Sequence, residues 1–127
     1  SVYQATILAE MGARVYTIER QKKLFDLHID YVFKAKYPTI KFFYGDGFEG
    51  LPTYAPFDKI IITAAAPFIP PKLVEQLKPR GIMVLPVNEG EGDQQRMIRI
   101  TKDANGEITE TSFDIFSFVP MLTGKNR

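Results

Sequence analysis

The chain has 127 residues, of which 45% are hydrophobic and 24% are charged, and its formal net charge is +1. These values are typical of one folded domain and disfavour a disordered chain, a collagen-like repeat and a disulfide scaffold. With no cysteine and a single histidine, the chain can form neither a thiolate nucleophile nor a cysteine-ligated or multi-histidine metal centre. The balanced charge indicates no nucleic-acid partner, and the apolar runs are far shorter than the roughly 20 residues of a membrane span.

The first half of the chain alternates between helical and strand patterns. It opens on Ser1, directly inside an apolar pattern with helical spacing, and Gly12 is placed to end that helix. No basic segment precedes this apolar stretch, so we expect no signal peptide and a cytoplasmic protein. The predicted elements are a helix over 1–11, a strand over 13–19, a helix over 20–36, a strand over 40–44 and turns over 45–56.

The second half is richer in strand patterns. The run over 57–63 is almost continuously apolar, which predicts a strand covered on both faces of a sheet. The pair Asn105-Gly106 predicts an antiparallel hairpin. The other predicted elements are a helix over 70–77, a connecting turn over 78–81 and strands over 82–87, 95–102 and 108–119. This order predicts one α/β domain over 1–127, with a sheet that is parallel first and antiparallel at one edge.

Two acidic residues follow strands at the edge where such sheets bind ligands, beyond the carboxyl ends of the strands. Glu19 ends the first strand, and a carboxylate in this position accepts hydrogen bonds from both ribose hydroxyls in nucleoside-binding folds. The alternative for Glu19 is an ion pair with Arg20. Asp46, within Gly45-Asp46-Gly47, is placed to accept a hydrogen bond from the amino group of adenine. The alternative is an ordinary Asp-Gly turn.

Small residues lie at the end of the predicted strand over 57–63, at the same predicted edge of the sheet. The run Thr63-Ala64-Ala65-Ala66 leaves room for a ligand to approach the backbone. The alternative is close packing of a helix against the sheet, which alanine serves equally well. These patterns by themselves leave both interpretations open.

Five motifs follow one another along the chain: SxYQATILAEMGARVYTIER, YGDG, APFDKIIITAAAP, LVEQLKPRGIMVLPV and FVPMLTG. In this order they closely resemble the protein-L-isoaspartate O-methyltransferase family over essentially the whole chain. The resemblance covers the C-terminal majority of that family. Its members carry an N-terminal helical segment, a Ser/Thr-containing substrate loop, a first strand and a glycine-rich cofactor loop before this point. Val2 stands where the family usually has glycine.

The resemblance implies a fold, an activity and partners. The fold is that of Rossmann-like S-adenosylmethionine-dependent methyltransferases, with a mostly parallel sheet, a C-terminal antiparallel hairpin and, here, no first strand. The activity is protein repair: methyl transfer from S-adenosyl-L-methionine to the α-carboxylate of L-isoaspartyl residues in damaged proteins and peptides. Because the expected catalytic Ser/Thr and the cofactor loop lie upstream, we expect this fragment to be inactive. Its exposed sheet edges favour a homodimer.

The resemblance also implies two sets of site residues in this sequence. Glu19 would bind the ribose of the cofactor and Asp46 the adenine. A carboxylate substrate is already an anion at neutral pH, so the reaction needs orientation and no protein nucleophile. The cofactor-binding residues are Glu19, Asp46, Gly47, Thr63 and Ala64, and the substrate-binding residues are Ala65, Ala66, Pro120 and Thr123.

Two other functions remain open at the level of the sequence. A piece of a nicotinamide-dependent dehydrogenase also fits Glu19, although the turn at Asp46 and the terminal hairpin disfavour it. A binding protein that kept the fold and lost the catalytic site is the second alternative. A GxGSG-type loop upstream of Ser1 would favour the methyltransferase, and a GxGxxG loop would favour the dehydrogenase. Tight binding of S-adenosylhomocysteine to the 127-residue chain would contradict the non-catalytic binding protein and the expected damage to the site.

Overall fold

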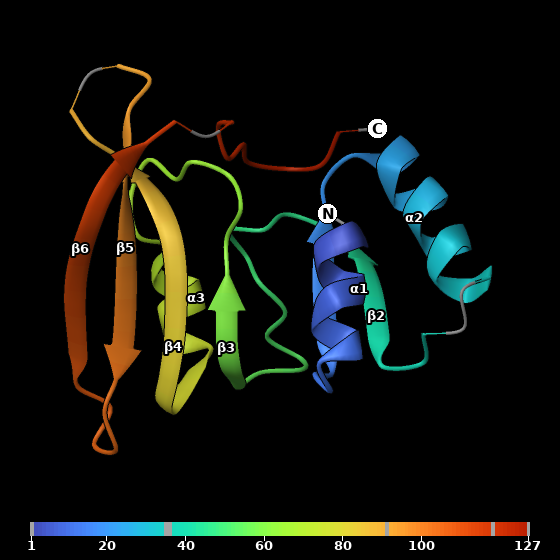
Figure 1. Cartoon of the computed structure of the whole chain (residues 1–127), viewed down its shortest axis with the longest axis horizontal. Helices are drawn as coiled ribbons and strands as arrows, with labels where there is room; N and C mark the ends of the chain where they lie inside the picture. Colours follow the sequence, from blue (N-terminus) through green and yellow to red (C-terminus); the bar gives the residue numbers. More distant parts are fainter. Residues whose placement is uncertain (1, 35–36, 91, 118, 127) are drawn as a thin grey trace. The chain divides into compact units, whose positions relative to one another are not determined.

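The computed structural model describes residues 2–34, 37–90, 92–117 and 119–126 (Figure 1). Their contacts divide the chain into two compact units. The first unit comprises Ser1–Gly47 with Thr123–Arg127, and the second comprises Phe48–Leu122. The single domain expected over 1–127 stays a prediction.

The first unit is a two-stranded parallel sheet with two helices. Strands β1 and β2 pair in register from Val15↔Ile40 to Glu19↔Tyr44. Their core consists of Ala5, Val15 and Ile40, with Phe42 packed against it. The elements are α1 (Val2–Glu10), β1 (Val15–Glu19), α2 (Lys22–Lys34) and β2 (Ile40–Tyr44). All four predicted elements are therefore present, and β2 has the predicted bounds.

Helix α1 ends where the sequence predicts. Gly12 has a φ of 96°, and its N–H donates to the carbonyl of Ala9 at 3.0 Å. The N–H of Ala13 donates to the carbonyl of Leu8 at 3.1 Å. These bonds satisfy carbonyls that the last helical turn leaves without partners, and the positive φ explains why glycine occupies the position.

Helix α2 packs on β2 through aromatic rings. The Phe25 ring lies 5.8 Å from that of Phe42 and 5.9 Å from that of Tyr44, between centroids. His28 meets Phe42 edge-on at 5.5 Å. The half-buried His28 ring therefore lies on the side of α2 that faces the sheet.

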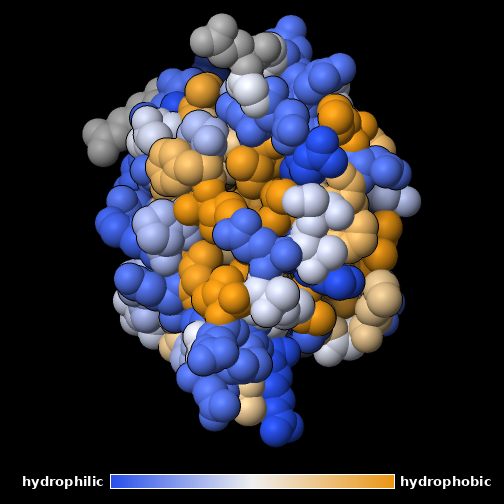
Figure 2. All heavy atoms as spheres, turned by 90° about the vertical axis from the view of Figure 1, so that its left-hand side faces the viewer, coloured by the Kyte–Doolittle hydropathy of each residue, from blue (hydrophilic) through white to orange (hydrophobic). Residues whose placement is uncertain are grey.

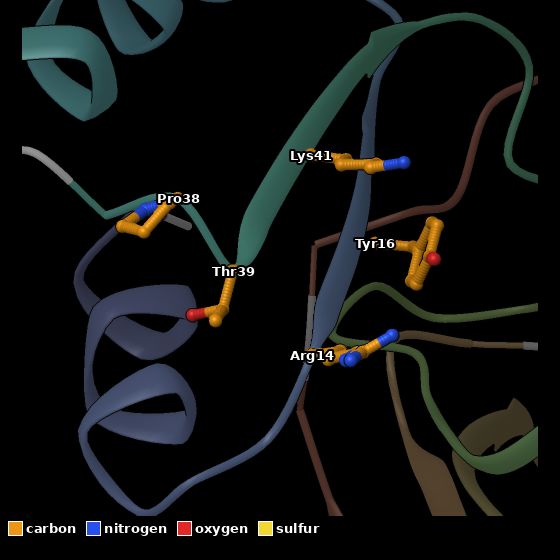
Figure 3. A pocket seen from close by; sticks show the side chains of 5 residues that line it. All are labelled: Arg14, Tyr16, Pro38, Thr39 and Lys41. Carbon is orange, nitrogen blue, oxygen red and sulfur yellow. The ribbon is translucent and has the colours of Figure 1, made fainter.

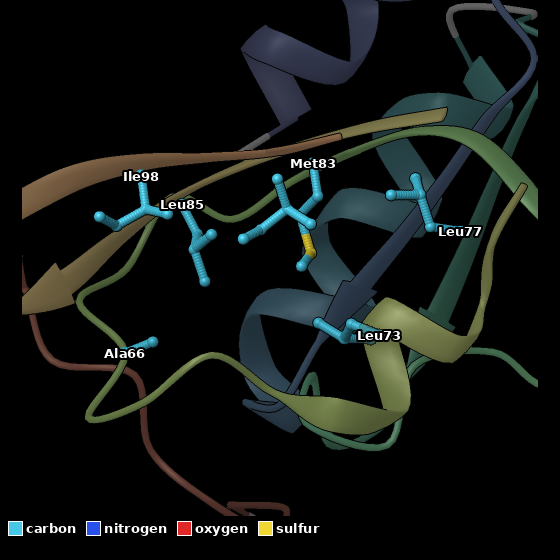
Figure 4. Close-up of a cluster of buried hydrophobic side chains, with 7 residues drawn as sticks. Ala66, Leu73, Leu77, Met83, Leu85 and Ile98 are labelled. Atoms are coloured by element: carbon cyan, nitrogen blue, oxygen red, sulfur yellow. The ribbon is translucent and has the colours of Figure 1, made fainter. Parts of the chain in front are cut away.

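The second unit is a four-stranded sheet with one short helix. The strand order is β3-β4-β5-β6; β3 is parallel to β4, and the other two pairings are antiparallel. Figure 4 shows its core, one buried cluster that includes Leu73 of α3, Met83 and Leu85 of β4 and Ile98 of β5. The elements are β3 (Phe57–Ile61), α3 (Pro71–Glu75), β4 (Leu77–Asn88), β5 (Gln95–Lys102) and β6 (Ile108–Phe116).

The predicted hairpin is confirmed between β5 and β6. Asp103 Oδ1 accepts hydrogen bonds from the N–H groups of Asn105 and Glu107, at 2.8 and 2.9 Å. Gly106 has a φ of 85°. The local turn chemistry therefore suffices to place this connection.

Two expectations about the sheet are wrong for the described residues. The single, mostly parallel sheet is replaced by two sheets, and two of the four strand pairings are antiparallel. β3 is not covered on both faces, since Lys59 is exposed and Ile61 is 52% exposed. The physical reason is that α3, the one helix among the described residues of this unit, shares a core with Ile60, so no helix of the unit covers the opposite face, which carries Lys59 and Ile61.

The connecting turn expected over 78–81 is instead an irregularity inside β4. Phe57 of β3 pairs with Leu77, but Lys59, two residues on, pairs with Ile82. The extra residues of β4 bulge out of the ladder, and Arg80 has a φ of 66°. The Pro and Gly residues of this stretch thus mark a bulge and not the boundary of the strand.

Candidate functional site

The two predicted carboxylates lie at the same end of the β1–β2 pair. Glu19 is the last residue of β1, and Asp46 follows the end of β2 by two residues. The N–H of Gly45 donates to the carbonyl of Glu19 at 3.0 Å and so ties the turn after β2 to the end of β1. The first unit therefore holds two half-buried carboxylates at the carboxyl edge of its parallel strands.

Glu19 is not paired with Arg20. The Glu19 Oε1 atom accepts a hydrogen bond from the N–H of Gln21 at 3.0 Å, and Oε2 receives none from the described part of the chain. The Arg20 guanidinium donates instead to the carbonyl oxygens of Gly124, from Nε at 3.2 Å, and Thr123, from Nη2 at 3.4 Å. Within the described residues, the ion-pair alternative for Glu19 does not hold, and one carboxylate oxygen faces no protein donor.

Asp46 belongs to more than a local turn. Its Oδ2 atom accepts a hydrogen bond from the N–H of Gly124 at 3.0 Å, across 78 positions of sequence. Gly124 follows Thr123, a predicted substrate residue, so the first unit gathers Glu19, Asp46 and Thr123 at one edge. The sequence gives no signal for the contact between Asp46 and Gly124, because its donor is a backbone group.

Apart from Gly47, which follows Asp46 in the first unit, the remaining predicted residues belong to the second unit. The N–H of Ala65 donates to the carbonyl of Val119, and the N–H of Met121 donates to the carbonyl of Ala65, each at 2.6 Å. These bonds place Ala65 beside Pro120 in a parallel bridge. Ala66 has no exposed surface and belongs to the hydrophobic core. At Ala66 the packing alternative is therefore the one that the structure supports.

The other residues of the small run are more accessible. Thr63 is exposed and Ala64 is half-buried, just beyond the end of β3. The N–H of Ile62 still donates to the carbonyl of Val84 at 3.0 Å, so the strand ladder ends immediately before Thr63. Thr63 and Ala64 are thus positioned by the end of β3, as the sequence predicts.

A hollow that the sequence did not indicate lies at the opposite end of β1 and β2. Its volume is about 220 Å³. Figure 3 shows the side chains that line it. Its residues precede or begin the two strands, whereas Glu19 ends β1 and Asp46 follows β2. The Lys41 Nζ atom lies 5.7 Å from the centroid of the Tyr16 ring, its cross-strand neighbour. The hollow is lined by Arg14, Tyr16, Pro38, Thr39 and Lys41.

The shifted acid–base equilibria lie away from the predicted residues. A hydrogen bond from Arg96 lowers the pKa of the Glu89 carboxyl, and the same contact raises the pKa of Arg96. Both groups stand where β4 and β5 meet, and Arg96 also donates from Nη1 to the carbonyl of Phe113 on β6 at 2.9 Å. This pair, with Glu89 exposed and Arg96 half-buried, links strands and involves none of the predicted site residues.

Metal and membrane features are absent from the part of the chain that the structure describes. No cluster of three or more His, Asp or Glu side chains there could hold a metal ion. None of the helices in the same residues is long and apolar enough to cross a membrane.

Comparison with solved structures identifies the class of fold. A structure of a protein-L-isoaspartate O-methyltransferase matches with a TM-score of 0.87 at 20% identity, over 98% of this chain and 40% of that chain. A Plasmodium falciparum protein described as a protein-L-isoaspartate O-methyltransferase, crystallised with S-adenosyl-L-homocysteine, matches with a TM-score of 0.73 at 22% identity. That match covers 95% of this chain and 58% of the other. The fold is that of these methyltransferases, with both parallel and antiparallel strands.

Sequence comparison identifies the family. The family model described as protein-L-isoaspartate(D-aspartate) O-methyltransferase matches residues 1–126, and the chain belongs to this family. The protein-L-isoaspartate O-methyltransferase of Cytophaga hutchinsonii is 46% identical over 126 residues, covering 99% of this chain and 55% of its own length. The protein-L-isoaspartate O-methyltransferase of Christiangramia forsetii is 41% identical over 126 residues. That match covers 99% of this chain and 58% of the relative's length. The chain thus spans little more than half the length of these relatives.

Proposed function

We propose that the protein containing this sequence transfers a methyl group from S-adenosyl-L-methionine to the α-carboxylate of L-isoaspartyl residues in damaged proteins. Membership of the family supports this activity, and it disfavours the nicotinamide-dependent dehydrogenase. The structural observation that carries the proposal is the pair of half-buried carboxylates, Glu19 and Asp46, at the carboxyl edge of β1 and β2. The proposed location is the cytoplasm, as expected from the sequence.

The residues present fit the nucleoside part of this cofactor. Ribose hydroxyls and the adenine amino group are hydrogen-bond donors, and ionised carboxylates are pure acceptors. Glu19 has an oxygen that receives no hydrogen bond from the described residues, which suits a ribose hydroxyl. Asp46 and Gly47 would face the adenine, and Thr63 and Ala64 complete the proposed cofactor-binding set.

In the proposed reaction, the main contribution of this chain is to orient the substrate carboxylate and the methyl group. When bound, S-adenosyl-L-methionine supplies an electrophilic methyl group. Ala65, Pro120 and Thr123 are the proposed substrate-binding residues, whereas Ala66 is left out because it is fully buried in the core. Among them the backbone of Ala65 is fixed by the bonds to Val119 and Met121. Such fixed backbone suits a reaction in which alignment of the reactants can contribute about 7–11 kcal/mol.

The proposal includes self-association through exposed sheet edges. In the described residues β1 pairs with β2 alone, and β3 and β6 form the edges of the second sheet. Figure 2 views the molecule from the β6 side and shows hydrophobic residues among hydrophilic ones. Phe113, Ile115 and Phe116 of β6 are 44%, 43% and 49% exposed. Unpaired strand edges with apolar side chains are typical sites of association.

Calorimetric titration tests the cofactor assignment. The protein containing this sequence is titrated with S-adenosylhomocysteine and, separately, with a nicotinamide dinucleotide. We expect saturable binding of S-adenosylhomocysteine alone. Binding of the dinucleotide alone would support the dehydrogenase, and binding of neither would contradict the proposed cofactor site.

A further inference from the structure

Residues 123–126, here called the C-terminal segment, are fastened to the junction between β1 and α2. The N–H of Asn126 donates to the carbonyl of Arg20 at 2.7 Å, and the N–H of Lys22 donates to the carbonyl of Asn126 at 2.9 Å. The Lys125 Nζ atom lies 4.9 Å from the centroid of the Tyr44 ring at the end of β2. The segment thus lies along the edge that carries Glu19 and Asp46.

Gly124 connects a cation to a carboxylate through its backbone. Its carbonyl accepts from Arg20 Nε at 3.2 Å, and its N–H donates to Asp46 Oδ2 at 3.0 Å. The φ of Gly124 is +72°, in the left-handed region that favours glycine, and a Cβ at this position would meet no atom within 4 Å. Backbone conformation, and not space, is therefore what requires glycine here.

We propose that Arg20 and Gly124 form a latch that sets the orientation of the Asp46 carboxylate and thereby selects a 6-aminopurine. This inference rests on the proposed function, in which Asp46 accepts from the adenine amino group. Arg20 acts as a positioning residue, because it reaches the nucleobase only through Gly124 and Asp46. A correctly oriented carboxylate accepts from a 6-amino group and repels a 6-oxo group, so loss of orientation reduces discrimination between them.

The first arm of the test compares two ligands that differ at purine position 6. S-adenosylhomocysteine and S-inosylhomocysteine are titrated into the protein containing this sequence and into its Arg20→Gln and Gly124→Ala variants. We expect the preference for the adenosyl ligand to fall roughly tenfold or more in both variants, as for a lost hydrogen bond to a charged group. If the role of the two residues is merely structural, the variants bind both ligands more weakly by the same factor and the preference is unchanged. That result would overturn the proposal.

Arg14→Gln is the matched control, because Arg14 is an exposed arginine of the same unit that lies at the opposite end of β1. We expect its preference between the two ligands to equal that of the wild type. An equal loss in Arg14→Gln and Arg20→Gln would show that net charge is responsible and would contradict the latch.

The second arm needs no ligand and separates the latch from the proposed function. Amide hydrogen exchange of Gly124 is measured by NMR in the wild type and in the Arg20→Gln, Asp46→Asn and Arg14→Gln variants. We expect faster exchange in the first two variants only. Unchanged exchange in Arg20→Gln would overturn the latch, whatever the ligands do. If exchange behaves as expected but the wild type binds neither ligand, the proposed function and the selectivity are wrong while the latch itself stands.

Discussion

The Glu19 carboxylate forms no ion pair with the described residues, so a substitution there tests the proposed ribose contact without breaking an ion pair. In Glu19→Gln the acceptor that would face both ribose hydroxyls loses its charge. We expect the affinity for S-adenosylhomocysteine to fall about tenfold or more, in line with about 1.5–3 kcal/mol for a hydrogen bond to a charged group. Calorimetry measures this loss.

The control is Glu75→Gln, the same change at an exposed residue of α3. We expect it to bind S-adenosylhomocysteine as the wild type does. An unaltered affinity in Glu19→Gln would remove Glu19 from the proposed site.

Gly50 tests how tightly the turn before β3 is packed. Gly50 and Gly90 share a φ of +63°, but a Cβ on Gly50 would overlap the Gln76 amide and approach Leu73 Cδ2 at 2.7 Å, whereas Gly90 has open space. Gln76 is buried, accepts from the N–H of Leu51 at 2.9 Å and donates to the carbonyl of Glu49 at 3.0 Å. The overlap would break this pair of bonds.

We expect Gly90→Ala to lower the free energy of unfolding by about 1–2 kcal/mol, because alanine is strained in the left-handed backbone conformation. Gly50→Ala should lower the free energy of unfolding by about 1–3 kcal/mol more, because of overpacking and broken hydrogen bonds. Denaturant unfolding of the two variants gives the difference. Equal losses would show that the Gln76 amide moves away at no cost.

The candidate site could be predicted only where side-chain type carries the information. Glu19 and Asp46 follow strands in a parallel pattern, so a sequence pattern places them at one edge. The hydrogen bonds of the Arg20 guanidinium could not be predicted, since they go to the backbone carbonyls of Thr123 and Gly124, more than 100 positions away. The same pattern could not decide whether Ala66 lines a site or packs in the core.

At the scale of elements, we expect the stability that the Glu89–Arg96 pair contributes at the β4–β5 connection to depend on pH. Arg96 lowers the pKa of Glu89 in the folded state, so the pair stabilises the fold above the ordinary pKa of a glutamate. This stabilisation disappears as the pH falls through the lowered pKa of the folded state. We expect the stability difference between wild type and Glu89→Gln to be positive at neutral pH and to vanish in acid.

Thermal unfolding between pH 7 and about pH 3 measures this difference, since the window spans the ordinary glutamate pKa. The effect should be small and sensitive to salt, because the Glu89 side chain is exposed and the Arg96 side chain is still in part accessible to solvent. A difference that stays constant over the whole range would contradict the assigned role of the pair.

Most elements could be predicted, and two of the three failures, at β3 and over 78–81, concern single strands and have physical causes. The 105–106 hairpin and the end of α1 depend on local turn chemistry, which the sequence contains directly. The exposure of β3 depends on which helices cover each face of its sheet, and an apolar run in the strand does not contain that information. The bulge over 78–81 has the composition of a turn, so a local pattern cannot distinguish a turn between elements from a bulge within β4.

At the scale of the whole molecule, the open strand edges predict self-association. We expect the chain to be at least dimeric by light scattering coupled to size-exclusion chromatography. Ile115→Lys on β6 should shift it towards the monomer, because a charge on an edge strand disfavours pairing with another edge. A monodisperse monomer in the wild type would contradict this prediction.

Ile29→Lys is the control for this measurement. Ile29 of α2 is 42% exposed and Ile115 is 43% exposed, so the two substitutions add equal charge at equally accessible isoleucines. We expect Ile29→Lys to leave the association unchanged. An equal effect of both substitutions would point to charge in general and not to the edge of β6.

The central claim is that the protein containing this sequence methylates isoaspartyl carboxylates. The most direct measurement follows the transfer of labelled methyl groups from S-adenosyl-L-methionine to two peptides of the same sequence, one with an L-isoaspartyl residue and one with L-aspartate. We predict a base-labile methyl ester on the isoaspartyl peptide and none on the aspartyl peptide. Label on neither peptide, or equal label on both, would contradict the proposed function.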